Sequence, residues 1–430
     1  MDCKAENKVH EYKNKYIREW WQTSAEFPGF LRVYDAGRQR NTEKKMDAVI
    51  EQMMEEVRKR PENIQKECTV WGSRIRSLLC IIGDEILELD GGGVDILLEG
   101  GYCKVTSDFI DKARSFDPSV KTRDIVQAMR NAWIMNCIQV LTGRAVEYTP
   151  ELFAYSMLYP YTDNYLDAVE VDADKKLKFG TRLRSRLEGN PAVPENRYET
   201  KLFKLVEMIE DRYDRRRFPE VYESLLQIHD AQQKSLIQQK GLISPYESDI
   251  LGASFEKGGA SVLADAYLIN GTLTEAQAAF MFGFGIFLQL TDDAQDVEDD
   301  LGNRHMTMFS QTAGKWPLDP LMNRLMNFMS DLLENDQCFN EPYMTEHKRL
   351  IRSSCTFLLL VSVANNSSRY GREYIKRLEK HSPFSFGYLR KLYRKASREF
   401  ASLFCKEREI PMDSIMARAL AESIEVCHDT

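Results

Sequence analysis

Cysteine patterns that would indicate a zinc site or a redox pair are missing from this sequence. The nine cysteines form no C-x-x-C pair, and several lie in apolar helical patterns, as free buried thiols do. The N-terminal segment is polar and charged, so no signal peptide is evident. The longest apolar runs, such as 280–290 and 356–364, are too short to span a bilayer. We therefore expect a cytoplasmic protein without a transmembrane segment.

Glycine and proline are also scarce, and few segments alternate apolar and polar residues as a β-strand does. The chain of 430 residues contains 23 glycines and 14 prolines, and amphipathic patterns with a period of 3.6 residues dominate it. No short repeat, low-complexity tract or linker divides it. The sequence therefore predicts an all-α fold in a single domain over 1–430, with an N-terminal helical extension at 1–60 and a core bundle at 121–405.

Acidic residues outnumber basic ones, with 66 Asp and Glu against 58 Lys and Arg. The net charge of −8 argues against a general nucleic-acid binder or a binder of anionic membranes. An anionic substrate would therefore need local basic groups or a bound metal ion. The oligomeric state stays open between a monomer and a homodimer.

The most informative stretch covers residues 280–302. Its first half is almost wholly apolar, and six acids then follow within nine positions. If this stretch is one helix, Asp292, Asp296 and Asp300 share a face, where like charges repel by about 0.2–0.5 kcal/mol per pair. No lysine or arginine alternates with them. Hard oxygen ligands at the end of a buried helix favour a divalent cation, and the alternative is a solvated acidic helix end.

A second acidic cluster ends another apolar helix, predicted at 149–167. Asp163 and Asp167 stand one turn apart, with Asn164 beside them, and Pro160 is expected to kink or restart the helix. Two such helices facing each other would place carboxylates on both walls of a cavity mouth, with apolar side chains below. That arrangement suits Mg²⁺, which binds one or two carboxylates together with substrate phosphate oxygens.

Two other metal sites are excluded. An EF-hand counted from Asp296 has Leu301 at position six and Thr307 at position twelve, where glycine and glutamate are required. The H-E-x-x-H zinc motif is absent, and no histidine lies in either acidic cluster.

The helix predicted at 247–269 carries Lys257-Gly258-Gly259 in its middle. A glycine inside a helix costs about 1 kcal/mol relative to alanine, so the pair indicates a close approach to the backbone or a kink. Beyond the acidic stretch, residues 301–320 are predicted to form a loop that acts as a lid and excludes water.

These elements resemble a known superfamily. Leu288–Asp296, L-Q-L-T-D-D-A-Q-D, resembles the second aspartate-rich motif F-Q-x-x-D-D-x-x-D of trans-isoprenyl diphosphate synthases. Asp163–Asp167, D-N-Y-L-D, resembles their first motif D-D-x-x-D, with Asn164 in place of the second aspartate. Lys257-Gly258 resembles their Lys-Thr element, whose lysine meets diphosphate. The resemblance covers roughly 124–370.

Several motifs of that superfamily are absent here, and their absence narrows the resemblance to one group within it. The upstream motif G-G-K-R-x-R-P and the later R-R-G-x-P, which hold the second diphosphate in the chain-elongating enzymes, are missing. The class II motif D-x-D-D is absent as well. The chain is therefore most similar to bacterial large terpene synthases. This resemblance implies a class I helical bundle with a central apolar cavity, and metal-dependent ionisation of a long allylic prenyl diphosphate (C20–C35, with C25 or longer favoured).

The resemblance also assigns roles to individual residues. It implies Mg²⁺, three ions per site, with Mn²⁺ as an alternative. The expected metal ligands are Asp163, Asn164, Asp167, Asp292, Asp293, Asp296 and Asp300. The expected catalytic residues are Asp163, Asp167, Asp292, Asp296 and Lys257. The expected substrate-binding residues are Lys257, Arg304, Arg369, Tyr370, Gln289, Tyr159 and Tyr155.

Two other functions stay open. A chain-elongating prenyltransferase would share the metal sites, and the missing basic motifs speak against it, although Arg182, Arg184 and Arg186 could rebuild an anion pocket. A catalytically inactive helical scaffold would keep the fold alone, and the two acidic clusters speak against that.

Overall fold

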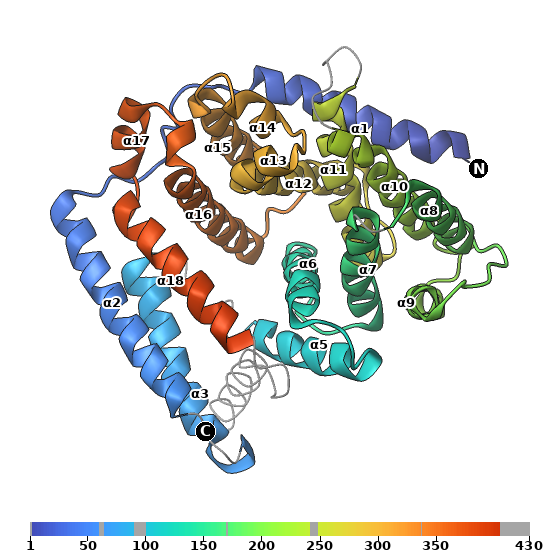
Figure 1. Ribbon diagram of the computed structural model, residues 1–430, viewed down its shortest axis with the longest axis horizontal. Coiled ribbons are helices and arrows are strands. Elements are labelled where there is room, and N and C mark those ends of the chain that lie inside the picture. The colour runs from blue at the N-terminus through green and yellow to red at the C-terminus, as the bar shows by residue number, and fades with distance from the viewer. Residues whose placement is uncertain are drawn as a thin grey trace. The chain divides into compact units, whose positions relative to one another are not determined.

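The computed structural model describes residues 2–59, 64–89, 100–168, 171–240, 248–336 and 338–404. Every regular element in these ranges is a helix, so the predicted all-α class is confirmed for this part of the chain (Figure 1). None of the helices in the same ranges combines the length and apolar character needed to cross a membrane.

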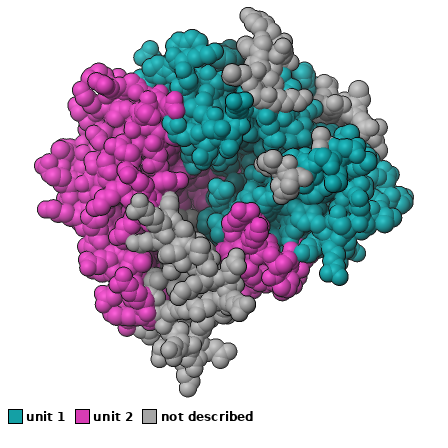
Figure 2. All heavy atoms as spheres, in the orientation of Figure 1, with its two compact units in different colours: residues 1–27, 126–138, 149–338 teal, residues 28–125, 139–148, 339–430 magenta. Residues whose placement is uncertain are grey.

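The contacts within the chain group it into two compact units, coloured separately in Figure 2. Unit 1 contains Met1–Phe27, Val126–Ile138 and Thr149–Cys338, and unit 2 contains Pro28–Ile125, Gln139–Tyr148 and Phe339–Thr430. The single domain expected over 1–430 stays a prediction.

Unit 1 is built around two helices, α11 (Ile250–Asn270) and α12 (Glu275–Gln295), which pack closely against each other. Their apolar sequences are buried on nearly all sides, as the interior of a large helical unit requires. The other helices of this unit are α1 (Asp2–Gln22), the middle of α6 (Thr122–Leu141), α7 (Pro150–Asp167), α8 (Ala173–Leu187), α9 (Arg197–Arg212), α10 (Pro219–Ser235), η2 (Leu236–Lys240), α13 (Val297–Asn303), α14 (Met308–Ala313) and α15 (Asp319–Glu334).

Glycines make the close packing of α11 on α12 possible. A Cβ atom at Gly258 would overlap the carbonyl oxygen of Gly285 and the Cβ of Gln289. A Cβ atom at Gly259 would overlap the ring of Phe282. The close approach expected from the Gly258-Gly259 pair is therefore confirmed, and it fixes Lys257 beside the C-terminal half of α12.

The N-terminal helix α1 packs on α11 and α12. Its Tyr16 ring stacks on Phe282 at 6.3 Å between centroids, and the Tyr16 hydroxyl donates to the carbonyl of Ala279 at 2.7 Å. Gly283 leaves the space that the Tyr16 ring fills. A helix that the sequence indicated as polar thus contributes to the core of unit 1 through one aromatic face.

Unit 2 consists of helices from both ends of its sequence. Within it α2 packs on α3, and α16 packs on α17 and α18. The π-helix η1 continues α3 directly. The elements are α2 (Ala36–Arg58), α3 (Ile64–Cys80), η1 (Ile81–Ile86), α5 (Tyr102–Phe116), the two ends of α6, α16 (Pro342–Asn365), η3 (Ser367–Arg369), α17 (Arg372–Glu379) and α18 (Phe386–Phe404).

The structure refines two local expectations, at 280–302 and at Pro160, and corrects a third, the loop at 301–320. The stretch 280–302 is two helices, because α12 ends at Gln295 and Asp296 (φ −90°, ψ 12°) separates it from α13. The predicted loop at 301–320 contains the end of α13 and all of α14, whose start is capped by Thr307. Helix α7 runs without restarting through Pro160, which lies inside it.

Candidate functional site

The C-terminal end of α12 carries one buried and one exposed aspartate side by side. Asp293 is only 4% exposed, and Asp292 is exposed. The Asp293 carboxylate accepts hydrogen bonds from Gln289 Nε2 at 2.8 Å and from Ser254 Oγ on α11 at 3.0 Å. Burial and the charge of Asp292 together raise the pKa of Asp293 to about 7, although both hydrogen bonds act to lower it. Asp293 therefore links the acidic end of α12 to α11.

Asp296 and Asp300, further along the chain, are repelled by neighbouring carboxylates. Burial and then the charges of Asp292 and Asp299 raise the pKa of Asp296 to about 6. Burial and then the charges of Asp293 and Asp296 raise the pKa of Asp300 to about 7. The Thr307 hydroxyl at the start of α14 donates to Asp300 at 3.4 Å and opposes this rise. Carboxylates that raise the pKa of a neighbouring carboxyl group form a region of concentrated negative charge.

Helix α7 brings the first acidic cluster to the same region of unit 1. Lys257 Nζ lies 3.9 Å from Asp163 Oδ1, which joins α11 to α7. Burial raises the pKa of Tyr159 to about 12, and the nearby charges of Asp163 and Asp292 act in the same direction. Asp163, Lys257 and Asp292, which the sequence assigned to one site, are therefore close enough in the fold to influence one another.

One member of this region was missed from the sequence. The charge of Arg130 on α6 lowers the pKa of both Tyr159 and Asp296, against the stronger effect of burial. Arg130 is exposed and lies outside every motif, so only its position in the fold reveals it. Together with Lys257 it supplies positive charge beside the aspartates.

The arrangement does not present a finished metal site. Within the described ranges, no three or more His, Cys, Asp or Glu side chains group closely enough to hold a metal ion. Asp167 is the last residue of α7, and its side chain lies outside the described residues. Asn164 is exposed one turn earlier. The ligand set expected from the sequence thus stays a prediction.

Tyr155 and Tyr159 line an apolar pocket in unit 1, as expected for cavity residues. The pocket lies among α7, α8 and α10, and Leu183, Leu225 and Ile228 complete its apolar wall. Its volume is about 40 Å³, far below the roughly 300–1,000 Å³ typical of ligand pockets. The central cavity expected for a long prenyl chain therefore stays a prediction.

The remaining expected substrate-binding residues lie in different places. Arg304 is exposed and ends α13 in a left-handed conformation, with φ at 58°. Arg369 and Tyr370 belong to unit 2, where the Tyr370 ring stacks on Tyr374 at 5.9 Å. Their expected role in substrate binding stays a prediction.

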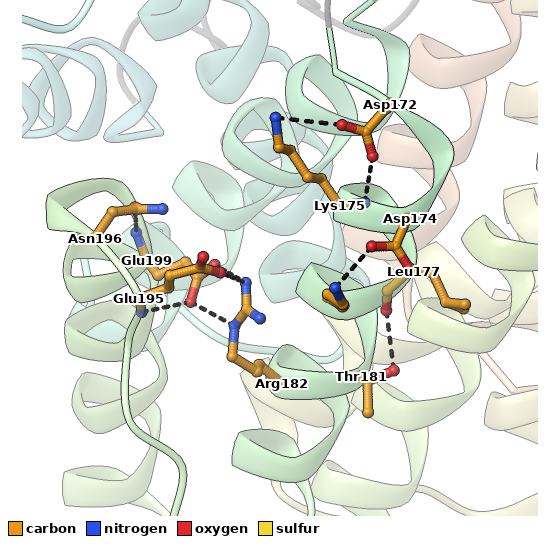
Figure 3. Close-up of polar contacts among 10 residues, drawn as sticks. Asp172, Asp174, Lys175, Leu177, Thr181, Arg182, Glu195, Asn196 and Glu199 are labelled. Carbon is orange, nitrogen blue, oxygen red and sulfur yellow. Dashed lines mark hydrogen bonds and ion pairs between the residues drawn. The ribbon is translucent and has the colours of Figure 1, made fainter.

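The arginines of α8, which could have rebuilt a second anion pocket, each bind a carboxylate. Figure 3 shows Arg182 directed at Glu199, with Nε donating to Oε2 at 2.9 Å, and Glu195 beside it. Arg184 binds Asp230 and Glu188, and Arg186 binds Glu210. Burial alone would raise the pKa of Glu199, but the hydrogen bonds from Arg182 and from the Glu195 backbone, together with the charge of Arg182, lower it below its ordinary value.

A second missed residue lies deeper, two turns after Lys257 on α11. Asp265 is fully buried and accepts a hydrogen bond from Asn131 Nδ2 on α6 at 2.9 Å. Its Oδ2 has no hydrogen-bond partner among the described residues. Burial raises the pKa of Asp265 well above its ordinary value. An aspartate inside the apolar run 260–269 is the sequence signal that could have revealed it.

Comparisons with protein-family models, with curated proteins and with solved structures find no match to this chain.

Proposed function

We propose that the protein is a class I terpene synthase, a lyase that releases diphosphate from a long allylic prenyl diphosphate and forms a linear or cyclic terpene. The observation that carries the proposal is the group of acids from α7, α12 and α13 around Lys257. The charges of Asp163 and Asp292 both raise the pKa of Tyr159, and the charge of Asp292 also raises the pKa of Asp296 and of Asp300. The resemblance of both motifs to bacterial large terpene synthases adds to it.

Magnesium fits this group by charge and by donor chemistry. Carboxylate oxygens are the ligands that Mg²⁺ prefers, and a cation would relieve the repulsion among Asp292, Asp296 and Asp300. The residues that would hold it are Asp163, Asp167, Asp292 and Asp296. When bound, it would neutralise the charge of the leaving diphosphate. The acids would have to converge further to form the full ligand set.

The chain's own residues would bind and orient the substrate. Lys257, held next to Asp163 and fixed by the Gly258 contact, would bind the diphosphate. Asp293 would position α12 against α11 through its hydrogen bonds to Gln289 and Ser254. The pocket beside Tyr155 and Tyr159 would take the apolar chain, which requires α7, α8 and α10 to move apart.

The two competing functions differ in their support. Elongation needs a second anion pocket, and the pairing of Arg182, Arg184 and Arg186 with carboxylates speaks against one on α8. An inactive scaffold is favoured by one observation, the pocket of about 40 Å³ at the tyrosines.

One incubation distinguishes the three functions. The protein is incubated with Mg²⁺ and C15, C20, C25 or C35 allylic diphosphates, with and without isopentenyl diphosphate, and products are identified by mass spectrometry. A terpene synthase yields diphosphate and a hydrocarbon or alcohol regardless of isopentenyl diphosphate. A longer prenyl diphosphate would identify an elongating enzyme. No release from any substrate would support the scaffold.

A further inference from the structure

Unit 2 contains a cavity of about 150 Å³ that is rich in hydrogen-bond donors. Its wall comes from the segment before α2, the two residues after η1, helix α16 and the segment after α17, and several of these parts are distant in sequence. Six side chains on this wall carry N–H or O–H groups, and they are Arg32, Tyr34, Arg352, Ser353, Thr356 and His381.

The basic side chains are held in place by contacts within unit 2. The Arg352 guanidinium lies over the Phe30 ring at 5.9 Å from its centroid. Arg32 Nη1 donates to the Glu88 carbonyl at 3.3 Å. His381 Nδ1 lies 2.9 Å from the Arg32 carbonyl and 3.2 Å from the Leu31 carbonyl, so the ring is fixed against the segment before α2. These donors are therefore oriented before any ligand binds.

The wall has one carboxylate, and a third arginine binds it. Glu88 pairs closely with Arg38 on α2, which does not line the cavity, and its other oxygen lies 3.9 Å from Arg32 Nη1. The lining thus contains two arginines and one carboxylate, so basic side chains outnumber acidic ones on the wall. Glu88 also follows η1 with a φ of 49°, a conformation that non-glycine residues rarely adopt. A π-helix and a strained residue at one cavity are features that recur at functional sites.

The geometry points to a binding site in unit 2 for a small phosphate monoester with a compact apolar group. Six donor side chains around one space suit a tetrahedral phosphate, since its oxygens accept more hydrogen bonds than the two oxygens of a carboxylate. Phe30, Phe357, Leu360 and Pro383 supply an apolar wall for the remainder of the ligand. A volume of about 150 Å³ excludes a long chain. The site is independent of the function proposed for unit 1.

The test uses phenyl phosphate as the probe and isothermal titration calorimetry on the full chain in EDTA, which removes divalent metal from the acids of unit 1. We expect binding of one probe per chain. Arg352→Gln should weaken it about tenfold or more, because a charged hydrogen bond to phosphate is lost. Arg349→Gln is the matched control, since Arg349 is exposed on the same helix and does not line the cavity. It should leave the affinity within about twofold.

Several outcomes would overturn this site. They are the absence of binding, equal weakening by both arginine variants, and loss of binding in Lys257→Gln, which would place the probe in unit 1. Equal affinity for benzoate would overturn the phosphate assignment. If Arg352→Gln does not fold, as judged by its melting temperature, Thr356→Val replaces it. That variant removes one hydroxyl at nearly constant volume and should weaken binding about threefold or more.

Discussion

Unit 1 contains two arrangements of carboxylates that differ in what surrounds them. On α8, α9 and α10 the acids face arginines, and hydrogen bonds from Arg182 and Arg186 lower the pKa of Glu199 and Glu210 in spite of burial. At the end of α12 the acids face mainly one another, and burial and repulsion raise the pKa of Asp296 and Asp300. The first arrangement favours the folded chain, and the second stores repulsion that a bound cation would relieve.

This difference distinguishes acids that stabilise the fold from acids that serve a bound ligand. An acid that gains an arginine on folding supports the fold, so its removal should affect stability. An acid that folding brings close only to other acids destabilises the folded state at neutral pH. Acids of this kind are found mainly at functional sites. Three predictions test this distinction.

The largest effect is expected for Asp292→Asn, which removes an exposed charge from the acidic end of α12. Diphosphate release with Mg²⁺ should fall by about 10³-fold or more, corresponding to about 4 kcal/mol in the barrier. The melting temperature should not decrease, because a repelling charge is lost. Asp211→Asn is the control, since Asp211 is exposed on α9 and should leave release unchanged. Full activity of Asp292→Asn would show that this cluster does not serve the reaction.

A smaller effect on stability is expected when the buried partner of Arg182 is neutralised. The Glu199 side chain is 2% exposed, whereas the Glu195 side chain, which binds the same arginine, is 64% exposed. Glu199→Gln should lower the free energy of unfolding by about 3 kcal/mol, because it breaks a buried ion pair. Glu195→Gln should change it by less than about 1 kcal/mol. Chemical denaturation of both variants measures the difference, and equal values would contradict the role given to burial.

The smallest effect concerns pH in the absence of metal. Because the pKa of Asp300 is raised to about 7 in the folded chain, the folded state keeps a proton that the unfolded state loses above about pH 4. Stability in EDTA should therefore fall as the pH rises from about 4 to 7. Asp300→Asn should reduce that fall by an amount of order 1 kcal/mol. Melting curves between these pH values test it, and an unchanged slope in the variant would argue against the raised pKa.

The helical class and the proximity of the site residues differ in how far the sequence could predict them. The sequence predicted helices at 149–167 and 247–269, close to α7 and α11, because helical patterning and helix start signals are local properties. The break at Asp296 and the helix α14 were not predicted. The residue that caps α14, Thr307, lies in a stretch of sequence that is also typical of a loop. Arg130 and Asp265 were missed because their significance depends on helices distant in sequence.

The resemblance placed Asp163, Lys257 and Asp292 in one region, which the fold supports. It could not give the volume beside Tyr159, because that volume depends on how α8 and α10 pack against α7. Small changes in helix separation open or close such a space without any change in the motifs. Pocket size is therefore a property of packing that periodicity and motif spacing do not contain.

The glycine contact between α11 and α12 has a consequence for how related chains can be identified. Since the two backbones touch at Gly258 and Gly285, positions along both helices are measured from one fixed point. Each residue added to a helix turns it by about 100° and lengthens it by about 1.5 Å. One residue inserted between Gly285 and Asp292 would thus rotate the acids away from Lys257 while the glycine contact remained. Relatives with the same chemistry should therefore keep a lysine directly before the glycine that corresponds to Gly258. They should also keep an aspartate seven positions after the glycine that corresponds to Gly285, even where the rest of the chain has diverged.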